Sequence, residues 1–333
     1  MILLLSSSGD YSTRVIVKWL KHFGYKDYLR IDAFDFVKRD IKILPAEGVF
    51  VVNDNAFNFE SVSVVWYRRF GGYATTPHYR YVKDCISETV AEQLKHELEN
   101  ICEYFVSLIP TNNIIGSTRK GNTNKLIELF KANQAGLNVA HTVVVSNKKL
   151  LLEAINDSGS LIAKSAYNAV GQKYKFNNYT QYTSRISEKD IEQFPETFFP
   201  SMVQQELKKD YEVRMLYLLG EIYCMAIISQ DNKQTEVDYR KYDTEIPNRF
   251  IPCEVDDETK RNVSKFMKSM DLNIGSLDFI RGLDGKLYFL EVNHMGQFGM
   301  VDNPCNYGIH RHIAELLIRM DRDEKQRDET FNR

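Results

Sequence analysis

The residues best suited to chemistry lie near the C-terminus, in a predicted hairpin of two strands. Asp278 lies in the stretch IGSLDFIRG, and Glu291 and Asn293 follow a turn at residues 283–286. Side chains alternate faces along a strand, so Glu291 and Asn293 share a face, and the hairpin can bring Asp278 beside them. Two carboxylates and one amide suit a hard cation, normally magnesium held through bound phosphates. The alternative is a surface hairpin with solvated acids.

Two lysines are placed to contact a polyphosphate. Lys125 lies early in a predicted helix over 122–135, and Lys164 ends a predicted strand before the small-residue segment SAYNAVG. A lysine at a strand end presents a compact charge, and the amides of a flexible loop add donors. Taken alone, each lysine is more often a solvated surface residue. The pattern GxxxxGK[ST] does not occur in the sequence, which argues against a P-loop nucleotide site.

The stretch VQQELKKDYEVR, at residues 203–214, is the second informative segment. An apolar strand runs into charges and resumes as another strand, so the intervening backbone can pair with the edge of an adenine. Glu212 can then accept hydrogen bonds from ribose hydroxyls, and Arg214 shares its face and can reach a phosphate or an acyl intermediate. An ordinary strand turn explains the stretch equally well.

Three further arginines are candidates for binding charge. Arg240 lies in the loop DYRKYD, and arginine suits the charge that develops on a transferred phosphoryl group or an oxyanion. Arg68 and Arg69 follow a predicted strand in VVWYRRFGG, where open α/β sheets bind ligands. A charged loop explains Arg240 as well, and a structural ion pair is as good an explanation as substrate contact for Arg68 or Arg69.

Bulk properties limit the class of protein. The 333 residues exceed one typical core and fit two or three domains, and the net charge of -2 does not indicate nucleic acid as a ligand. The five cysteines lack pair spacing, which argues against a disulfide framework or a zinc site and favours a reducing cytoplasm. The apolar start at residues 1–5 is too short for a signal sequence or membrane span, so no membrane is expected.

Hydrophobic patterns predict a first α/β domain over 1–110 that contains the elements which would position Arg68 and Arg69. We expect strands at 2–5, 49–53 and 62–67, a helix over 13–23 and a long helix over 82–108, with a mainly parallel sheet.

The patterns predict two further domains and a tail. Residues 111–200 are expected to form an α+β unit with helices at 122–135 and 148–156 and strands at 139–145 and 161–164. Residues 201–320 are expected to form an antiparallel domain with strands at 198–207, 212–219 and 221–229, a helix over 256–270, the hairpin and a helix over 307–320. The charged tail 321–333 is expected to be frayed.

The order of these features resembles the ATP-grasp superfamily over residues 110–320. The resemblance implies an α/β fold with an N-terminal α/β pre-grasp domain, a central α+β domain and a C-terminal antiparallel-sheet domain. The segments WYRR, DYR and EVNHMGQFGMVDNPCNYG look most like graspetide synthetases, the ribosomal-peptide macrocyclases, in their grasp-with-spasm branch. One departure is His294, where many relatives have proline, so the loop after Asn293 is expected to differ.

The resemblance assigns roles to residues of this sequence and implies ATP and Mg2+ as cofactors. The phosphate ligands are Lys125 and Lys164, the adenine contacts are the backbone of Gln205, Glu206 and Leu207, the ribose ligand is Glu212, the magnesium ligands are Asp278, Glu291 and Asn293, and the catalytic arginines for the acyl phosphate are Arg214 and Arg240.

The activity implied by the resemblance is ATP-dependent closure of ester or amide rings in a precursor peptide made of leader and core, by a cytoplasmic enzyme that is often a homodimer. An Asp or Glu side chain would be activated as an acyl phosphate and captured by Ser, Thr or Lys. Two alternatives remain: a ligase that adds amino acids to a protein tail or a small acid, of the ribosomal-protein glutamate ligase or glutathione synthetase type, and a non-catalytic ATP-binding protein.

Overall fold

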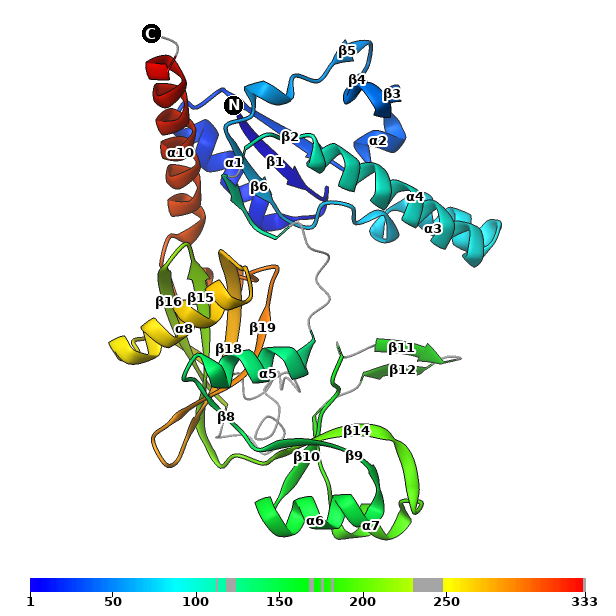
Figure 1. Cartoon of the computed structure of the whole chain (residues 1–333), viewed down its shortest axis with the longest axis vertical. Helices are drawn as coiled ribbons and strands as arrows, with labels where there is room; N and C mark the ends of the chain where they lie inside the picture. Colours follow the sequence, from blue (N-terminus) through cyan, green and yellow to red (C-terminus); the bar gives the residue numbers. More distant parts are fainter. Residues whose placement is uncertain are drawn as a thin grey trace. The chain divides into compact units, whose positions relative to one another are not determined.

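The computed structural model describes residues 1–111, 113–117, 124–167, 171–174, 177–180, 183–229 and 248–331. Contacts divide the chain into two units, one of residues 1–120 with 308–333 and one of residues 121–307 (Figure 1). The first unit is therefore built from both parts of the sequence that flank the second. The finer domain boundaries expected within 111–320 stay a prediction.

The first unit contains a parallel sheet in the order β2-β1-β6-β7, as the sequence predicted, and a separate antiparallel sheet in the order β3-β4-β5. Its elements are β1 (Ile2–Ser6), α1 (Tyr11–His22), β2 (Tyr28–Asp32), α2 (Asp35–Lys38), β3 (Ile41–Leu44), η1 (Pro45–Glu47), β4 (Val49–Val52), β5 (Asn55–Ala56), η2 (Phe59–Ser61), β6 (Val64–Tyr67), η3 (Tyr73–Thr75), α3 (Pro77–Cys85), α4 (Glu88–Ser107), β7 (Ile114–Ile115) and α10 (Ile309–Phe331). Every residue of β1 is buried, as expected for a central strand covered on both faces.

Helices α1 and α10, far apart in the sequence, pack side by side in this unit (Figure 1). On the other face of the sheet, Leu3 and Leu5 pack into an aromatic core that includes Phe36, Phe50 and Phe105. Such ring clusters bury large apolar areas and dominate core stability. Helices thus cover one face of the sheet, and a core rich in phenylalanine covers the other face.

The structure corrects two expectations in this unit. The predicted long helix over 82–108 is two helices, because Ile86 and Ser87 interrupt it between α3 and α4. The tail predicted to fray instead continues α10 as far as Phe331.

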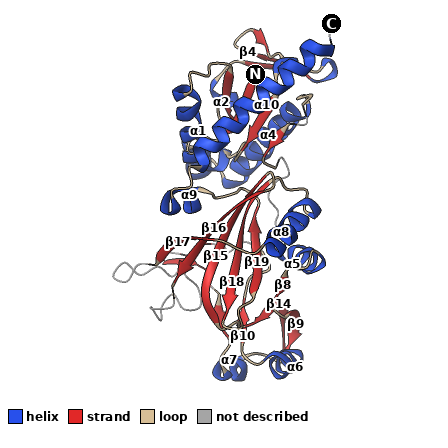
Figure 2. Ribbon diagram, turned by 90° about the vertical axis from the view of Figure 1, so that its left-hand side faces the viewer, coloured by secondary structure: helices blue, strands red, loops and turns tan. Residues whose placement is uncertain are grey.

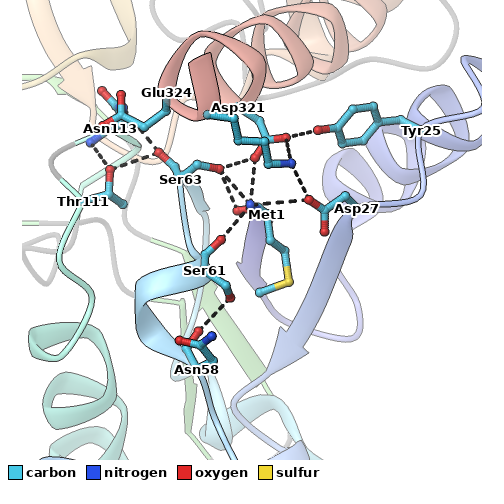
Figure 3. A network of polar contacts seen from close by, with 11 residues as sticks. Met1, Tyr25, Asp27, Asn58, Ser61, Ser63, Thr111, Asn113, Asp321 and Glu324 are labelled. Atoms are coloured by element: carbon cyan, nitrogen blue, oxygen red, sulfur yellow. Dashed lines mark hydrogen bonds and ion pairs between the residues drawn. The ribbon is translucent and has the colours of Figure 1, made fainter. Parts of the chain in front are cut away.

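A polar network at α10 explains the ordered tail (Figure 3). Asp321 is fully buried and lies 2.8 Å from the amino group of Met1, and Lys325 lies 2.7 Å from Asp321. Tyr25 and Ser63 also donate hydrogen bonds to Asp321. The charges that suggested a solvated tail are therefore used within the unit.

The second unit contains a mostly antiparallel sheet in the order β17-β16-β15-β18-β19-β8, a sheet in the order β13-β10-β14-β9, and the hairpin β11-β12. Its elements are α5 (Lys125–Gln134), β8 (Asn138–Val139), β9 (Thr142–Asn147), α6 (Lys148–Ser158), β10 (Leu161–Ala163), β11 (Gly171–Tyr174), β12 (Asn177–Thr180), β13 (Ser184–Arg185), α7 (Glu188–Gln193), β14 (Thr197–Gln205), β15 (Lys209–Leu218), β16 (Glu221–Ile228), β17 (Arg249–Cys253), α8 (Asp257–Ser269), β18 (Ile274–Gly282), β19 (Leu287–Asn293) and α9 (Gly299–Cys305).

Helices α5 and α8 cover one face of the larger sheet of this unit (Figure 2). Met215, Leu277 and Phe289 of the sheet pack there against Phe266 and Met267 of α8. Successive strand residues point to opposite faces, so the polar residues between these apolar positions lie on the face away from the two helices. Among the described residues, no helix is long and apolar enough to cross a membrane.

Candidate active site

The predicted hairpin is confirmed, with the candidate metal ligands together on it. Asp278 of β18 pairs directly with Glu291 of β19, and Ser276 pairs with Asn293. Directly opposed residues have Cβ atoms about 4.5–5.5 Å apart, so the two carboxylates start from neighbouring positions on one face. Gly285 adopts φ +79 in the connecting turn, a conformation that favours glycine.

A β-bulge places these side chains correctly. The register shifts between Asp278 and Phe279, which pair with Glu291 and Phe289, so Leu290 is the extra residue of β19. Phe289 and Val292 are consequently both buried in the core, although three positions apart. Glu291 and Asn293 are left on the polar face. Bulges redirect side chains in this way and are common next to active sites.

Both predicted lysines converge on Glu291. The Nζ atom of Lys125 lies 3.0 Å from Glu291 Oε2, and that of Lys164 lies 3.8 Å from the same oxygen. Lys125 opens α5, whose N-cap Asn124 accepts hydrogen bonds from the first turn, and Lys164 follows β10. Two lysines that are 39 positions apart in the sequence thus present their charges to one carboxylate.

Arg214 and Asp278 form a bidentate ion pair. Arg214 Nε and Nη2 lie 2.7 and 2.8 Å from the two oxygens of Asp278, its direct partner across β15 and β18. Met300 of α9 packs its sulfur 2.9 Å from Arg214 Nη1. Forked pairs of this type fix orientation as well as charge. Arg214 therefore lies next to the candidate metal ligands, and its predicted role at a phosphate or an acyl intermediate stays a prediction.

The proposed nucleotide linker lies after β14. The Gln205 and Glu206 amides donate to the carbonyls of His141 and Ser160, whereas the Leu207 amide has no hydrogen-bond partner among the described residues. A half-buried amide of this kind is available to an acceptor on a ligand. The side chain of Glu206 is occupied, because Arg185 Nε donates to its Oε2 at 2.8 Å.

Glu212 is buried on β15 and is paired with Lys209. Its carboxylate lies on the same face as Arg214, since the two residues are separated by one position. The structure thus places Glu212 in line with the cluster and gives it a positive partner that the sequence analysis did not anticipate.

Glu128 was missed by the sequence analysis. It is fully buried on α5, one turn after Lys125, and its Oε2 accepts the Val292 amide at 3.2 Å. Burial, with help from the negative charge of Glu291, raises the pKa of Glu128 to about 7, although the Val292 hydrogen bond and the two lysines oppose the shift. The spacing of Lys125 and Glu128 on one helix face was the available signal.

His294 faces Glu128. Its Nε2 lies 3.7 Å from Glu128 Oε1, and neither atom has a hydrogen-bond partner among the described residues. Burial lowers the pKa of His294, which favours the neutral ring. His294, which stands where many graspetide synthetases have proline, therefore points toward the carboxylate of Glu128.

Two of the remaining predicted arginines, Arg68 and Arg69, belong to the first unit. Arg68 is buried and its Nε lies 3.2 Å from Asp10 Oδ1, which is the structural ion pair that the sequence left open. Arg69 is exposed and adopts φ +57. Arg240 lies outside the described residues, so its predicted role stays a prediction.

The donor set fits a hard divalent cation, with one condition. No group of three or more His, Cys, Asp or Glu side chains within the described residues is arranged to hold a metal ion. Asp278 and Glu291 are instead engaged by Arg214 and the two lysines, and Asn293 Oδ1 accepts the Met295 amide at 3.0 Å. The three oxygen donors suit Mg2+ when phosphates draw the lysines away.

Solved structures of ATP-grasp ligases share this fold, as the sequence predicted. No protein-family profile and no curated protein sequence matches the chain. The solved structures that it resembles are more informative.

Macrocyclase MdnC from Microcystis aeruginosa MRC, bound with precursor peptide MdnA, superposes with a TM-score of 0.75 at 22% identity over 96% of this chain and 99% of MdnC. A RiPP-associated ATP-grasp ligase from Chryseobacterium gregarium, in complex with ADP and a leader and core peptide, gives a TM-score of 0.79 at 20% identity over 96% of each chain. D-alanyl-alanine synthetase A from Vibrio cholerae gives 0.56 at 14% identity over 97% of each chain. The chain therefore shares the ATP-grasp fold over 96% of its length.

Proposed function

We propose that this protein is a graspetide synthetase, an ATP-dependent ligase that closes ester or amide rings in a ribosomal precursor peptide. The observation that carries the proposal is the agreement with two peptide-bound ligases over 96% of the chain, at TM-scores of 0.75 and 0.79. The similarity to D-alanyl-alanine synthetase A is much weaker, at 0.56. The arrangement is thus nearer to peptide-modifying members of the fold than to a ligase for single amino acids.

ATP would replace Glu291 as the partner of the lysines. Lys125 and Lys164 would bind phosphate oxygens, the backbone of Gln205, Glu206 and Leu207 would bind adenine, and Glu212 would bind the ribose. Glu291, released from the lysines, would join Asp278 and Asn293 in holding Mg2+. The ion spreads the charge of the transferring phosphoryl group.

The chemistry has two steps that balance without a redox partner. A carboxylate oxygen of the precursor attacks the γ-phosphorus of ATP and ADP leaves, which gives an acyl phosphate. A hydroxyl or amine of the same peptide then attacks the carbonyl carbon, loses its proton and expels phosphate. Arg214, and Arg240 by its predicted role, would stabilise the oxyanion between these events.

The partner and setting follow from the same proposal. The precursor would carry a leader and a core rich in Asp or Glu together with Ser, Thr or Lys, and the exposed Arg69 is a better substrate contact than the paired Arg68. We also propose that the protein is a homodimer in the cytoplasm, where ATP is available and cysteines stay reduced. The proposal includes no nucleic acid and no membrane as a partner.

The test is incubation of the purified protein with ATP, Mg2+ and a candidate precursor, followed by mass spectrometry. The proposal expects loss of one water mass per crosslink, together with ADP formation that depends on the precursor. A gain in mass would show the tail-adding ligase instead. ATP binding without any turnover across candidate peptides would favour the non-catalytic alternative.

A further inference from the structure

Where no described strand neighbours β19 on its outer edge, the side chain of Glu128 accepts a hydrogen bond from the backbone of β19. Among the described residues, β8 pairs with β19 only at Tyr288 and Phe289. Farther along, the amide of Val292 points to Glu128, whose Oε2 accepts it at 3.2 Å. A buried amide without a partner would be costly, so this hydrogen bond completes the strand at its unpaired end.

Val292 lies between the two ligand candidates on β19. Its side chain is buried in the core, while Glu291 and Asn293 on either side point to the polar face. Fixing the Val292 amide therefore fixes the backbone from which both ligands project. Residues that orient the ligands of a metal site commonly control its affinity for the metal ion in this way.

The second oxygen of Glu128 is not used by the strand. Oε1 is buried without a hydrogen-bond partner among the described residues, and His294 Nε2 lies 3.7 Å away in the same condition. An N–H···O bond would form if the two atoms approached to about 3.0 Å. This gap lies one residue beyond Asn293, so closing it would move the end of β19 on which Asn293 is carried.

We propose that Glu128 is a positioning residue that holds the end of β19 through the Val292 amide and thereby sets the affinity of Glu291 and Asn293 for a divalent cation. The inference rests on the proposed function only in naming that cation as the Mg2+ of bound ATP. Glu128 needs to supply an acceptor oxygen, so a neutral amide serves as well as a carboxylate.

Three variants separate positioning from stability. Glu128→Met removes the acceptor while it fills nearly the same buried volume, Glu128→Gln keeps an acceptor oxygen, and Leu129→Ala truncates the next residue of α5, which packs in the same core. Thermal unfolding of each variant reports its fold.

The readout is binding of Mn2+, followed by loss of the free-ion signal in electron paramagnetic resonance, with and without ADP. We expect Glu128→Met to weaken Mn2+ binding about 10–100-fold, in line with other residues that support metal ligands. Glu128→Gln should bind nearly as the unchanged protein does. Leu129→Ala should lower the unfolding temperature and leave Mn2+ binding unchanged.

Unchanged Mn2+ binding in Glu128→Met, or an equal loss in Leu129→Ala, would overturn the inference, as would failure of Glu128→Gln to restore binding. The proposed function can fail separately. If Mn2+ binding follows the expected order while no precursor is crosslinked, Glu128 keeps its role and the macrocyclase proposal is contradicted.

Discussion

Two clusters of buried charge, one in each unit, differ in how completely they are satisfied. In the first unit, Asp10 caps α1 through the Thr13 amide at 2.9 Å and accepts from Arg68 at 3.2 Å, and Trp66 donates to the Thr13 hydroxyl at 2.9 Å. The described residues include no unpartnered buried side-chain atom in this cluster. In the second unit, Glu128 and His294, near Glu291 and its two lysines, each have a buried atom without a hydrogen-bond partner in the part of the chain that the structure describes.

The difference indicates different purposes. A closed network of a cap, an ion pair and an indole donor stabilises the fold and offers nothing to a ligand. The second cluster combines several charges with carboxylates that solvent partly reaches, since the side chains of Asp278 and Glu291 are 18% and 28% exposed. Under the proposed function, its ion pairs would be exchanged for contacts with phosphates and a cation. The contrast can be tested by variants in each cluster.

The largest effect is expected from Asp10→Ala. It removes the helix cap and leaves Arg68 charged and buried without its carboxylate, which should cost about 3–5 kcal/mol in the free energy of unfolding. Chemical denaturation followed by circular dichroism measures it, with the exposed Asp40→Ala as control. A loss no larger than that of the control would mean that this cluster is not structural.

Glu291→Ala should act on turnover instead. Loss of a metal ligand is expected to lower ATP turnover by about 100-fold or more while the fold survives, because Glu291 is a half-exposed polar residue and not part of the core. ADP release and thermal unfolding are measured together, with exposed Glu254→Gln as control. Retained turnover would contradict the assignment of the metal site.

Arg214→Lys should have a smaller effect on the same site. Lysine keeps the charge but lacks the fork that contacts both oxygens of Asp278, so the rate of crosslinking should fall by about 10-fold with little change in ATP affinity. Separate measurement of kcat and of ATP binding decides. Equal losses in both would indicate a residue that only supports the fold.

The smallest effect is expected on the pH dependence of stability, to which Asp10 of the first cluster contributes. Burial alone would raise the pKa of Asp10, but the charge of Arg68 and hydrogen bonds from Thr13 outweigh it and lower that pKa from its ordinary 3.8. A carboxyl group whose pKa is lowered by folding stabilises the folded state at pH values above its ordinary pKa. This stabilisation is lost as the pH falls through the pKa of the folded state. The free energy of unfolding should therefore drop below about pH 4 less steeply in Asp10→Ala. Parallel acid titrations of both proteins would test this.

The sequence was sufficient for the parts that depend on local pattern. Alternation and turn residues predicted β18 and β19, and the facing positions of Asp278, Glu291 and Asn293 followed from the two-residue period. The helix predicted over 122–135 agrees with α5 to within three residues at its start and one at its end. The chemical features of the site were therefore visible before its geometry.

What the sequence could not show depends on contacts between distant segments. Glu128 was not singled out in the sequence, and only the packing of α5 on β19 reveals it as buried. Cys224 and Cys253 lack pair spacing yet are register partners on β16 and β17, and both are free. The break between α3 and α4 was hidden because residues 86 and 87 fit a continuous helical pattern.

Leu290 has a consequence for any attempt to shorten the hairpin. Because Leu290 is the extra residue of the bulge, its deletion would leave Phe289 facing the core, Glu291 on the polar face opposite Asp278, and Val292 in the core. Deletion of Val292 instead would shift Asn293 by one position and turn its side chain into the core. Engineers who shorten this hairpin should therefore remove Leu290 itself, or take residues out in pairs from the turn at 283–286.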